Sequence, residues 1–213
     1  MLEIARQRAV TYLRELQDII EFKESDIDSL SLSLSPLTFD AVLCRWRLMF
    51  LSNLDDTLTG IFNTLKKRGR LAAVVWSIQS KVPTIGFPMS IVTGEMNFSN
   101  PSVCPSTDNL KVPGPFFLAN ERILKDSLQK AGFKDIQIEI QNVTFEFASV
   151  NDYIKHLKGV AAPLKALLDK EFAGKQEEIW EMVAREVKDN FTNQETDDSI
   201  KMDNECICFV GTK

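Results

Sequence analysis

The sequence predicts an α/β fold built around a mostly parallel sheet. Two short apolar runs, residues 39–44 and 71–76, have the composition of strands that are covered on both faces. Between them, apolar residues recur at helical spacing: Leu58, Ile61, Phe62 and Leu65. Strand, helix and strand in this order form a unit whose strands run parallel and whose crossover is right-handed. Residues 206–210 add a last short strand.

The length and composition are those of an ordinary globular protein with one domain. The 213 residues are 44% hydrophobic and 26% charged. The formal net charge of −5 gives no basic surface for nucleic acid or for anionic lipid. No apolar run reaches the ~18–20 residues of a membrane span, and the N-terminus lacks the pattern of a signal peptide. We therefore expect a cytoplasmic protein with no nucleic-acid and no membrane partner.

The cysteine pattern predicts no metal site. The four cysteines are Cys44, Cys104, Cys206 and Cys208, none of them in a C-x-x-C pair, and the sequence has a single histidine. A zinc site needs more ligands at finger-like spacing. Cys206 and Cys208 point to one face of a strand, which is typical of small core residues. Unpaired thiols agree with a reducing cytoplasm.

The first half of the chain begins with an amphipathic pattern over residues 1–18, which predicts a helix. Its apolar residues are Leu2, Ala5, Ala9, Leu13 and Leu16. Residues 19–24 are expected to form a short strand. Residues 52–55 resemble a capping box, and the basic residues 66–68, followed by Gly69, are typical of a helix C-terminus.

The second half of the chain begins with a proline-rich segment. Residues 83–115 hold six of the eight prolines, so we expect an ordered excursion that is not one continuous helix. Asn120 is a candidate N-cap of a helix closed by Gly132. Residues 136–140 and 143–147 each alternate as strands do, and residues 151–191 have helical periodicity.

Five segments, in order along the chain, resemble class I S-adenosylmethionine-dependent methyltransferases of the type 11 kind. Residues 1–6 resemble the helix after the family's second strand, and residues 24–27 the acidic turn after its third. Residues 39–46 (FDAVLCRW) resemble the fourth strand and its end. Residues 65–71 resemble the turn before strand five, with Lys67-Arg68 in place of proline-glycine. Residues 118–133 resemble the helix before strand six.

The resemblance implies a Rossmann-like sheet, mostly parallel, with an antiparallel last strand. It implies one domain over residues 1–213, with residues 83–115 and 151–195 as excursions on the substrate side. The first two strands of the family are missing from the sequence, and no G-x-G-x-x-G motif occurs in it. We therefore expect an N-terminally truncated form, through a late-called start codon or a truncated gene. Loss of two inner strands would expose sheet edges, which favours self-association.

The resemblance also implies the binding residues. Asp26 would accept a hydrogen bond from the adenine amino group, and the Ile27 amide would face the ring; a turn-capping role for Asp26 is equally open. Cys44 and Arg45, at the end of strand four, would border the methionine portion of the cofactor. Trp46 and Trp76 would line the acceptor pocket. The alternatives are a surface ion pair for Arg45 and a core position for Trp76.

The predicted function is methyl transfer from S-adenosylmethionine to a small-molecule acceptor, impaired by the missing glycine-rich turn. Such a displacement depends mainly on positioning, and we assign no catalytic residue. His156 has a pKa near neutrality, but it lies in a helix that we expect at the surface. The alternative is a non-catalytic α/β remnant or interaction module. A nicotinamide-dependent oxidoreductase shares the fold class and is the third hypothesis.

Overall fold

The computed structural model describes residues 2–24, 36–93, 113–192 and 198–213 of the chain. A mixed sheet of four strands runs through the molecule, in the order β1-β2-β4-β3. The strands are β1 (Phe39–Arg45), β2 (Leu65–Trp76), β3 (Lys134–Phe147) and β4 (Ile200–Thr212). β1 and β2 are parallel, and β4 is antiparallel to both of its neighbours. The α/β class and the antiparallel last strand are confirmed; among the described strands, one pair is parallel and two pairs are antiparallel.

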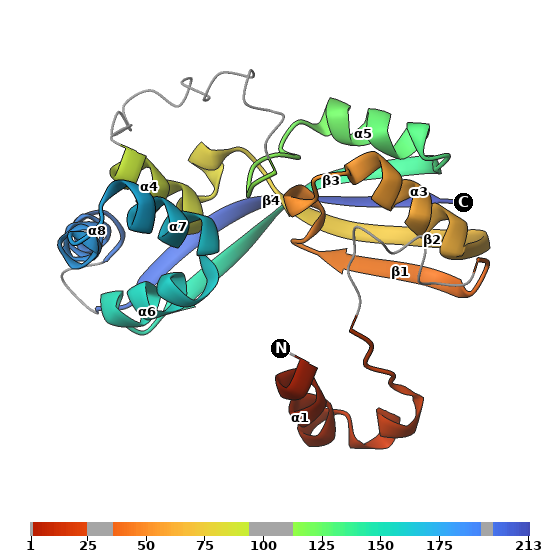
Figure 1. The fold of residues 1–213 in the computed structure, drawn as a ribbon, viewed down its shortest axis with the longest axis horizontal. Helices are drawn as coiled ribbons and strands as arrows, with labels where there is room; N and C mark the ends of the chain where they lie inside the picture. Colours follow the sequence, from red (N-terminus) through yellow and green to blue (C-terminus); the bar gives the residue numbers. More distant parts are fainter. Residues whose placement is uncertain (1, 25–35, 94–112, 193–197) are drawn as a thin grey trace.

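The helices around this sheet form two groups. The helical elements are α1 (Leu2–Tyr12), η1 (Arg14–Ile19), η3 (Leu48–Phe50), α3 (Leu54–Thr64), η4 (Gln79–Lys81), α4 (Pro83–Thr93), α5 (Glu121–Lys130), α6 (Val150–Val160), α7 (Ala162–Glu171) and α8 (Gln176–Phe191). α3 and α5 lie together along one face of the sheet, whereas α4, α6, α7 and α8 gather at the far end of β3 and β4 (Figure 1). We call this second group the helical unit.

Side-chain caps fix where several helices begin. Asn120 accepts hydrogen bonds from the backbone N–H groups of Arg122 and Ile123, as the sequence predicts for the start of α5. Asn53 caps α3 by accepting from the N–H of Asp56, one residue later than the predicted capping box. Ser149 caps α6 in the same way. These caps satisfy donors that a helix start leaves without a partner.

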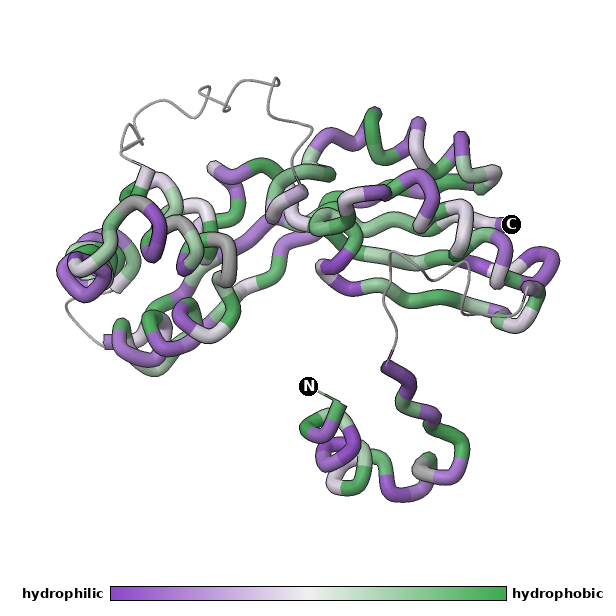
Figure 2. Tube along the Cα trace, viewed as in Figure 1, coloured by the Kyte–Doolittle hydropathy of each residue, from purple (hydrophilic) through white to green (hydrophobic). Residues whose placement is uncertain are grey.

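The sheet packs on α3 and α5 through one of its two faces. In β2, Leu71 and Val75 are fully buried, while the residues between them are less buried. They belong to a core shared with Leu58 and Ile61 of α3 and Leu124 of α5. Because side chains alternate along a strand, Ala73 shares this buried face, whereas Ala72 and Val74 point to the opposite one. Figure 2 shows the hydropathy of each position along the strands.

The helical unit has a second core of its own. It packs on the ends of β3 and β4, where Phe147, Ile200 and Met202 join the unit's apolar residues. A buried polar group lies at this junction: Asn204 of β4 accepts a hydrogen bond from the N–H of Thr84 at 3.0 Å. The hydroxyl of Tyr153 donates to the carbonyl of Thr84 at 2.9 Å. The unit is therefore joined to the sheet by polar as well as apolar contacts.

The N-terminal segment differs from the sequence prediction. The predicted helix over residues 1–18 is divided into α1 and η1, and the predicted strand over residues 19–24 is absent, since Ile19 ends η1 and residues 20–24 have no regular structure. Ala9 is the only buried residue of α1. The segment lies apart from the sheet, below β1 (Figure 1). An isolated strand has no partner for its backbone groups, which explains why this apolar run does not form one.

One further prediction is wrong, and two are confirmed with different bounds. Residues 66–68 lie in β2 and not at a helix end, and Lys66 forms an ion pair with Asp40 across the β1–β2 pair. Residues 134–147 form one long strand, because β4 pairs with nearly its full length. The predicted helical stretch 151–191 is three helices. In the proline-rich segment, residues 83–93 form α4 around Pro88, and residues 94–112 lie outside the described part of the chain.

Candidate functional site

Two tryptophans stack at the carboxyl ends of the parallel strands β1 and β2. Trp46 directly follows β1, and Trp76 is the last residue of β2. Their ring centroids are 4.4 Å apart with an interplanar angle of 16°. The parallel pairing of the two strands places their carboxyl ends at the same edge, so the stack follows from the topology. Ligands of open α/β sheets bind at this edge.

Two residues from other elements complete this aromatic cluster. Phe145 of β3 lies edge-on to both Trp46 and Trp76, at 6.1 and 6.0 Å between ring centroids. The imidazole of His156, from α6, lies 6.4 Å from the Phe145 ring and 5.3 Å from the Phe147 ring. The cluster therefore lies where the sheet meets the helical unit. We call Trp46, Trp76, Phe145 and His156 the aromatic cluster.

Burial lowers the pKa of His156 from its ordinary value of 6.5. Removal from water disfavours the imidazolium, so the neutral ring is the dominant form near neutral pH. A neutral imidazole can accept a proton. The expected surface position of His156 is wrong, since the side chain is half-buried and its ring contacts the aromatic residues of β3.

Trp46 combines an unusual backbone with an unsatisfied donor. Its φ of 50° lies in the left-handed region, which a bulky side chain rarely adopts. Its indole Nε1 is buried and has no hydrogen-bond partner among the described residues. Strain of this kind costs about 1–3 kcal/mol and concentrates at functional sites, and a buried N–H without a partner adds to that cost. The indole N–H is therefore a donor that the described residues leave unsatisfied.

Cys44 and Arg45 differ in where their side chains lie. The half-buried Cys44 packs against the core that α3 shares with the sheet, and this burial raises the pKa of its thiol. Arg45 is exposed, and its guanidinium carbon lies 5.2 Å from the centroid of the Trp46 ring. Arg45 therefore contributes a cation beside the aromatic cluster, whereas Cys44 contributes packing beneath it.

A polar group borders the cluster after β2. The hydroxyl of Ser77 donates to Oε1 of Glu205 at 2.6 Å, and Nζ of Lys81 lies 2.9 Å from Oε2. Partial burial alone would raise the pKa of Glu205, but the hydrogen bonds from Ser77 and Lys81 outweigh it and lower that pKa. The carboxylate therefore stays ionised, and it holds the segment that follows β2 against β4.

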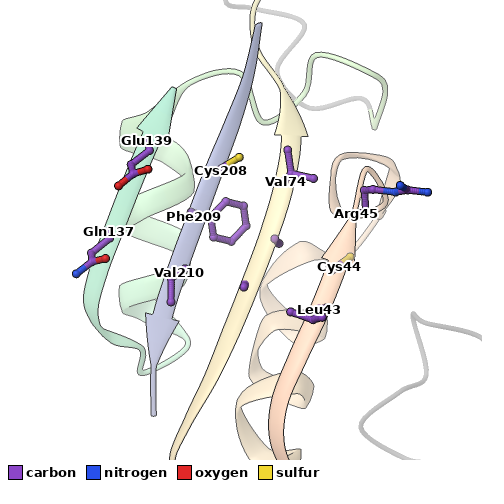
Figure 3. A pocket seen from close by; sticks show the side chains of 11 residues that line it. Leu43, Cys44, Arg45, Val74, Gln137, Glu139, Cys208, Phe209 and Val210 are labelled. Carbon is purple, nitrogen blue, oxygen red and sulfur yellow. The ribbon is translucent and has the colours of Figure 1, made fainter. Parts of the chain in front are cut away.

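One face of the sheet is left open beside the cluster. We call it the open face; it comprises Leu43, Arg45, Ala72, Val74, Gln137, Glu139, Cys208 and Val210. It encloses a shallow depression of about 440 Å³. The side chain of Leu43 is 82% exposed. Figure 3 shows this face, with α3 and α5 behind the sheet.

The structure brings together some of the predicted site residues. Arg45, Trp46 and Trp76 lie together at one edge of the sheet. Asp26 and Ile27 lie outside the described residues. Phe145 and His156 were not predicted, although Phe145 alternates on β3 with Val143 and Phe147 in the sequence. The signal that would have placed it is the β3–β4 register, which the sequence does not give.

Two classes of site lack support in the described residues. No cluster of three or more histidine, cysteine, aspartate or glutamate side chains in the described ranges could hold a metal ion. None of the helices in these ranges combines the length and apolar character that crossing a membrane requires.

Comparison with known proteins supports the family resemblance. Residues 1–73 match the family model described as a methyltransferase domain. No curated protein matches the chain. The resemblance drawn from the sequence is confirmed by this match, which covers the helix α1, the strand β1 and most of β2.

Solved structures resemble this chain at low sequence identity. The YcgJ protein of Bacillus subtilis has a TM-score of 0.56 at 14% identity, covering 100% of this chain and 78% of its own. A protein of Bacillus halodurans named as a candidate methyltransferase has a TM-score of 0.48 at 16% identity, covering 91% and 78%. Phosphoethanolamine N-methyltransferase 2 of Haemonchus contortus, in complex with S-adenosyl-L-methionine, has a TM-score of 0.39 at 14% identity, covering 84% and 34%. The first of these supports the Rossmann-like fold.

Proposed function

We propose that this chain, whose first 73 residues match the methyltransferase-domain family, takes part in S-adenosylmethionine-dependent methyl transfer to a small-molecule acceptor. The observation that carries the proposal is the aromatic cluster at the carboxyl ends of β1 and β2. This is the edge at which the fold class binds its ligands. S-adenosylmethionine, when bound, supplies a methyl group on a sulfonium. The protein's contribution is then to position the acceptor and exclude water.

The residues of the cluster fit one side of such a site. The unpartnered Nε1 of Trp46 is a donor without an acceptor in the chain, and a ligand oxygen or carboxylate would satisfy it. The guanidinium of Arg45, beside the same ring, suits a carboxylate such as that of the cofactor's methionine portion. The half-buried Phe145 ring offers apolar surface to the acceptor, while Trp76, only 5% exposed, takes the core position that was the alternative for it and supports Phe145 and Trp46 from beneath.

The other side of the site is incomplete in this sequence. No G-x-G-x-x-G motif occurs among the 213 residues, so no glycine-rich turn lets the backbone approach the cofactor closely. Asp26 and Ile27 remain the proposed adenine contacts. We therefore expect this chain to bind the cofactor weakly and to show impaired turnover. His156, neutral near pH 7 because burial lowers its pKa, is the member of the cluster that could accept a proton from the acceptor.

Calorimetric titration of S-adenosylmethionine into the 213-residue chain tests this proposal. We expect saturable binding that Trp46→Phe weakens by about 2- to 10-fold, since the variant keeps an aromatic ring but removes the indole N–H together with part of the ring system. Its thermal stability should fall as well, because the smaller ring packs less well against Trp76, so binding is compared at a temperature at which both proteins are folded. Lys125→Ala, on the exposed side of α5, is the control and should bind as the wild type does.

The second candidate function is that of a non-catalytic α/β module. The open face favours it, because a sheet face that presents Leu43 and Val74 to solvent suits a protein contact better than catalysis. The same titration separates the two functions. No saturable binding by the wild-type chain, together with no methylation across small-molecule acceptors, would favour the module and contradict the enzyme.

A further inference from the structure

We propose that the open face of the sheet is the interface of a symmetric dimer of this chain. Two described helices that contact this part of the sheet, α3 with β2 and α5 with β3, lie on the opposite face (Figure 3). The open face therefore presents apolar side chains to solvent, with Leu43 82% exposed and Val74, Cys208 and Val210 half-buried. Apolar surface of this kind on a sheet is stabilised by contact with a second surface.

The strand registers order the open face into two rows across the sheet. In the first, Leu43 pairs with Ala72, Ala72 with Val210, and Val210 with Gln137. In the second, Arg45 pairs with Val74, Val74 with Cys208, and Cys208 with Glu139. Residues paired in this way point to the same face of a sheet. Figure 3 shows the second row from Glu139 on one side to Arg45 on the other.

The second row ends in opposite charges. Arg45 is on β1 and Glu139 is on β3, the two outer strands of the sheet. Adjacent strands are about 4.8 Å apart, so these ends lie roughly 14 Å from each other across an apolar middle. Among the described residues, neither side chain forms a salt bridge: Arg45 lies against the Trp46 ring, and Glu139 accepts a hydrogen bond from Gln141. In the chain without bound cofactor, both charges are therefore available to a second copy.

This arrangement is complementary to itself. Two sheets pack face to face about 10 Å apart with their strands roughly aligned. A two-fold axis parallel to the strands, between β2 and β4, reverses the order of each row. Arg45 of one copy then faces Glu139 of the other, and the reverse pair forms on the other side of the axis. Val74 and Cys208 of both copies meet in the middle. The interface therefore pairs opposite charges at its two sides and apolar side chains at its centre.

The helical units leave room for this contact. Their main contacts with the sheet, among the described residues, are with β3 and β4, so the axis places the two units on opposite sides of the interface. The N-terminal segment is a competing occupant, because Ile4, Leu13 and Ile19 are also exposed. Arg6 and Glu3 of the segment already form an ion pair with each other within α1, whereas Arg45 and Glu139 of the open face have no ion-pair partner among the described residues.

Charge reversal measured by analytical ultracentrifugation of the full chain tests the proposal. The wild type should be a dimer whose dissociation constant rises about 10-fold or more in Arg45→Glu and in Glu139→Arg, because each change makes both intersubunit pairs repulsive. The double variant R45E/E139R should restore the wild-type dissociation constant to within about 3-fold. Lys125→Glu on α5 changes the net charge by the same amount and sign as Arg45→Glu, away from the open face, and should leave the dimer intact. Circular dichroism checks that each variant is folded.

Three outcomes would overturn the proposal. The wild type could remain a monomer at every concentration. A dimer could form that neither single reversal weakens. A monomer could show amide protection of β1 that is lost on deletion of residues 1–24, which would identify the N-terminal segment as the occupant of the open face. Failure of the double variant to recover, with both single variants folded and weakened, would also exclude the Arg45–Glu139 pairing.

Discussion

His156 is the only histidine of the sequence, and its ring lies against Phe145 and Phe147. Its position gives the aromatic cluster its one group that titrates near neutral pH. Because burial favours the neutral ring, the folded chain releases this proton at a lower pH than the unfolded chain does. The packing of the cluster and the protonation state of His156 therefore affect each other.

The stability of the chain should depend on this histidine in one pH window. The neutral ring's contribution is complete above the unfolded pKa of about 6.5, and it is lost as the pH falls from there through the lower, folded pKa. Urea unfolding of the wild type and of His156→Gln from about pH 7 to pH 5 should show a steeper loss of unfolding free energy in the wild type. Proton NMR of the single imidazole measures the pKa directly. A value at or above 6.5 would contradict the burial argument.

Residue types indicated the site only in part. Arg45 and Trp46 could be placed from the sequence because they follow an apolar strand, and Trp76 because it ends another. Phe145 and His156 could not, since their approach depends on the pairing of β3 with β4 and on the packing of α6 against β3. Asp26 and Ile27 lie outside the described residues and stay a prediction. Local patterns thus locate strand ends, and tertiary contacts decide what faces them.

At the scale of elements, α4 and α6 are joined by a hydrogen bond that replaces one lost at a proline. Pro88 lies inside α4 and has no N–H, so the carbonyl of Thr84, four residues earlier, lacks its usual helical donor. The hydroxyl of Tyr153 donates to that carbonyl at 2.9 Å, and Tyr153 is fully buried. The bond therefore satisfies a buried acceptor that the helix itself leaves without a partner.

Removal of this hydroxyl should destabilise the chain. Tyr153→Phe keeps the ring and leaves the Thr84 carbonyl buried without a donor, which costs about 1–3 kcal/mol. Urea denaturation at neutral pH measures the loss. In a Pro88→Ala background the restored N–H of residue 88 can serve the same carbonyl, so the Tyr153→Phe cost should fall by at least about half. An equal cost in both backgrounds would show that the two donors do not share this acceptor.

Helices and strands were predicted best where a local signal marks their ends. Asn120 capped its helix as expected, and the apolar runs at residues 39–44 and 71–76 became β1 and β2. The start of β2 was missed, because residues 66–68 read as the basic end of a helix. These residues lie at a register shift between the Leu65–Phe39 and Arg70–Ala41 pairs, and Arg68 has a φ of 68° where the family's turn has glycine. Sheet pairing is a long-range contact that a local pattern does not contain.

At the scale of the whole molecule, the residues that match the family and the residues that form the core are only partly the same. The family match covers residues 1–73, whereas most of the buried residues belong to the sheet, α3, α5 and the helical unit. The fold class could be predicted because strands and helices alternate. The separate position of α1 and η1 could not, since their amphipathic pattern indicates a partner surface without saying which surface it is.

The N-terminal segment should therefore contribute little to stability in this chain. Deletion of residues 1–24 removes one buried residue, Ala9, and helices that contact each other. We expect the unfolding free energy to change by less than about 0.5 kcal/mol, as for surface changes, and the urea m-value to stay near that of the wild type. Deletion of residues 198–213 serves as the opposite control, because it removes β4, which pairs with both β2 and β3, and should abolish folding. A loss above about 2 kcal/mol on removing residues 1–24 would mean that the segment packs on the sheet in solution. The open face would then be covered by the chain's own N-terminus, and the dimer interface would have to lie elsewhere.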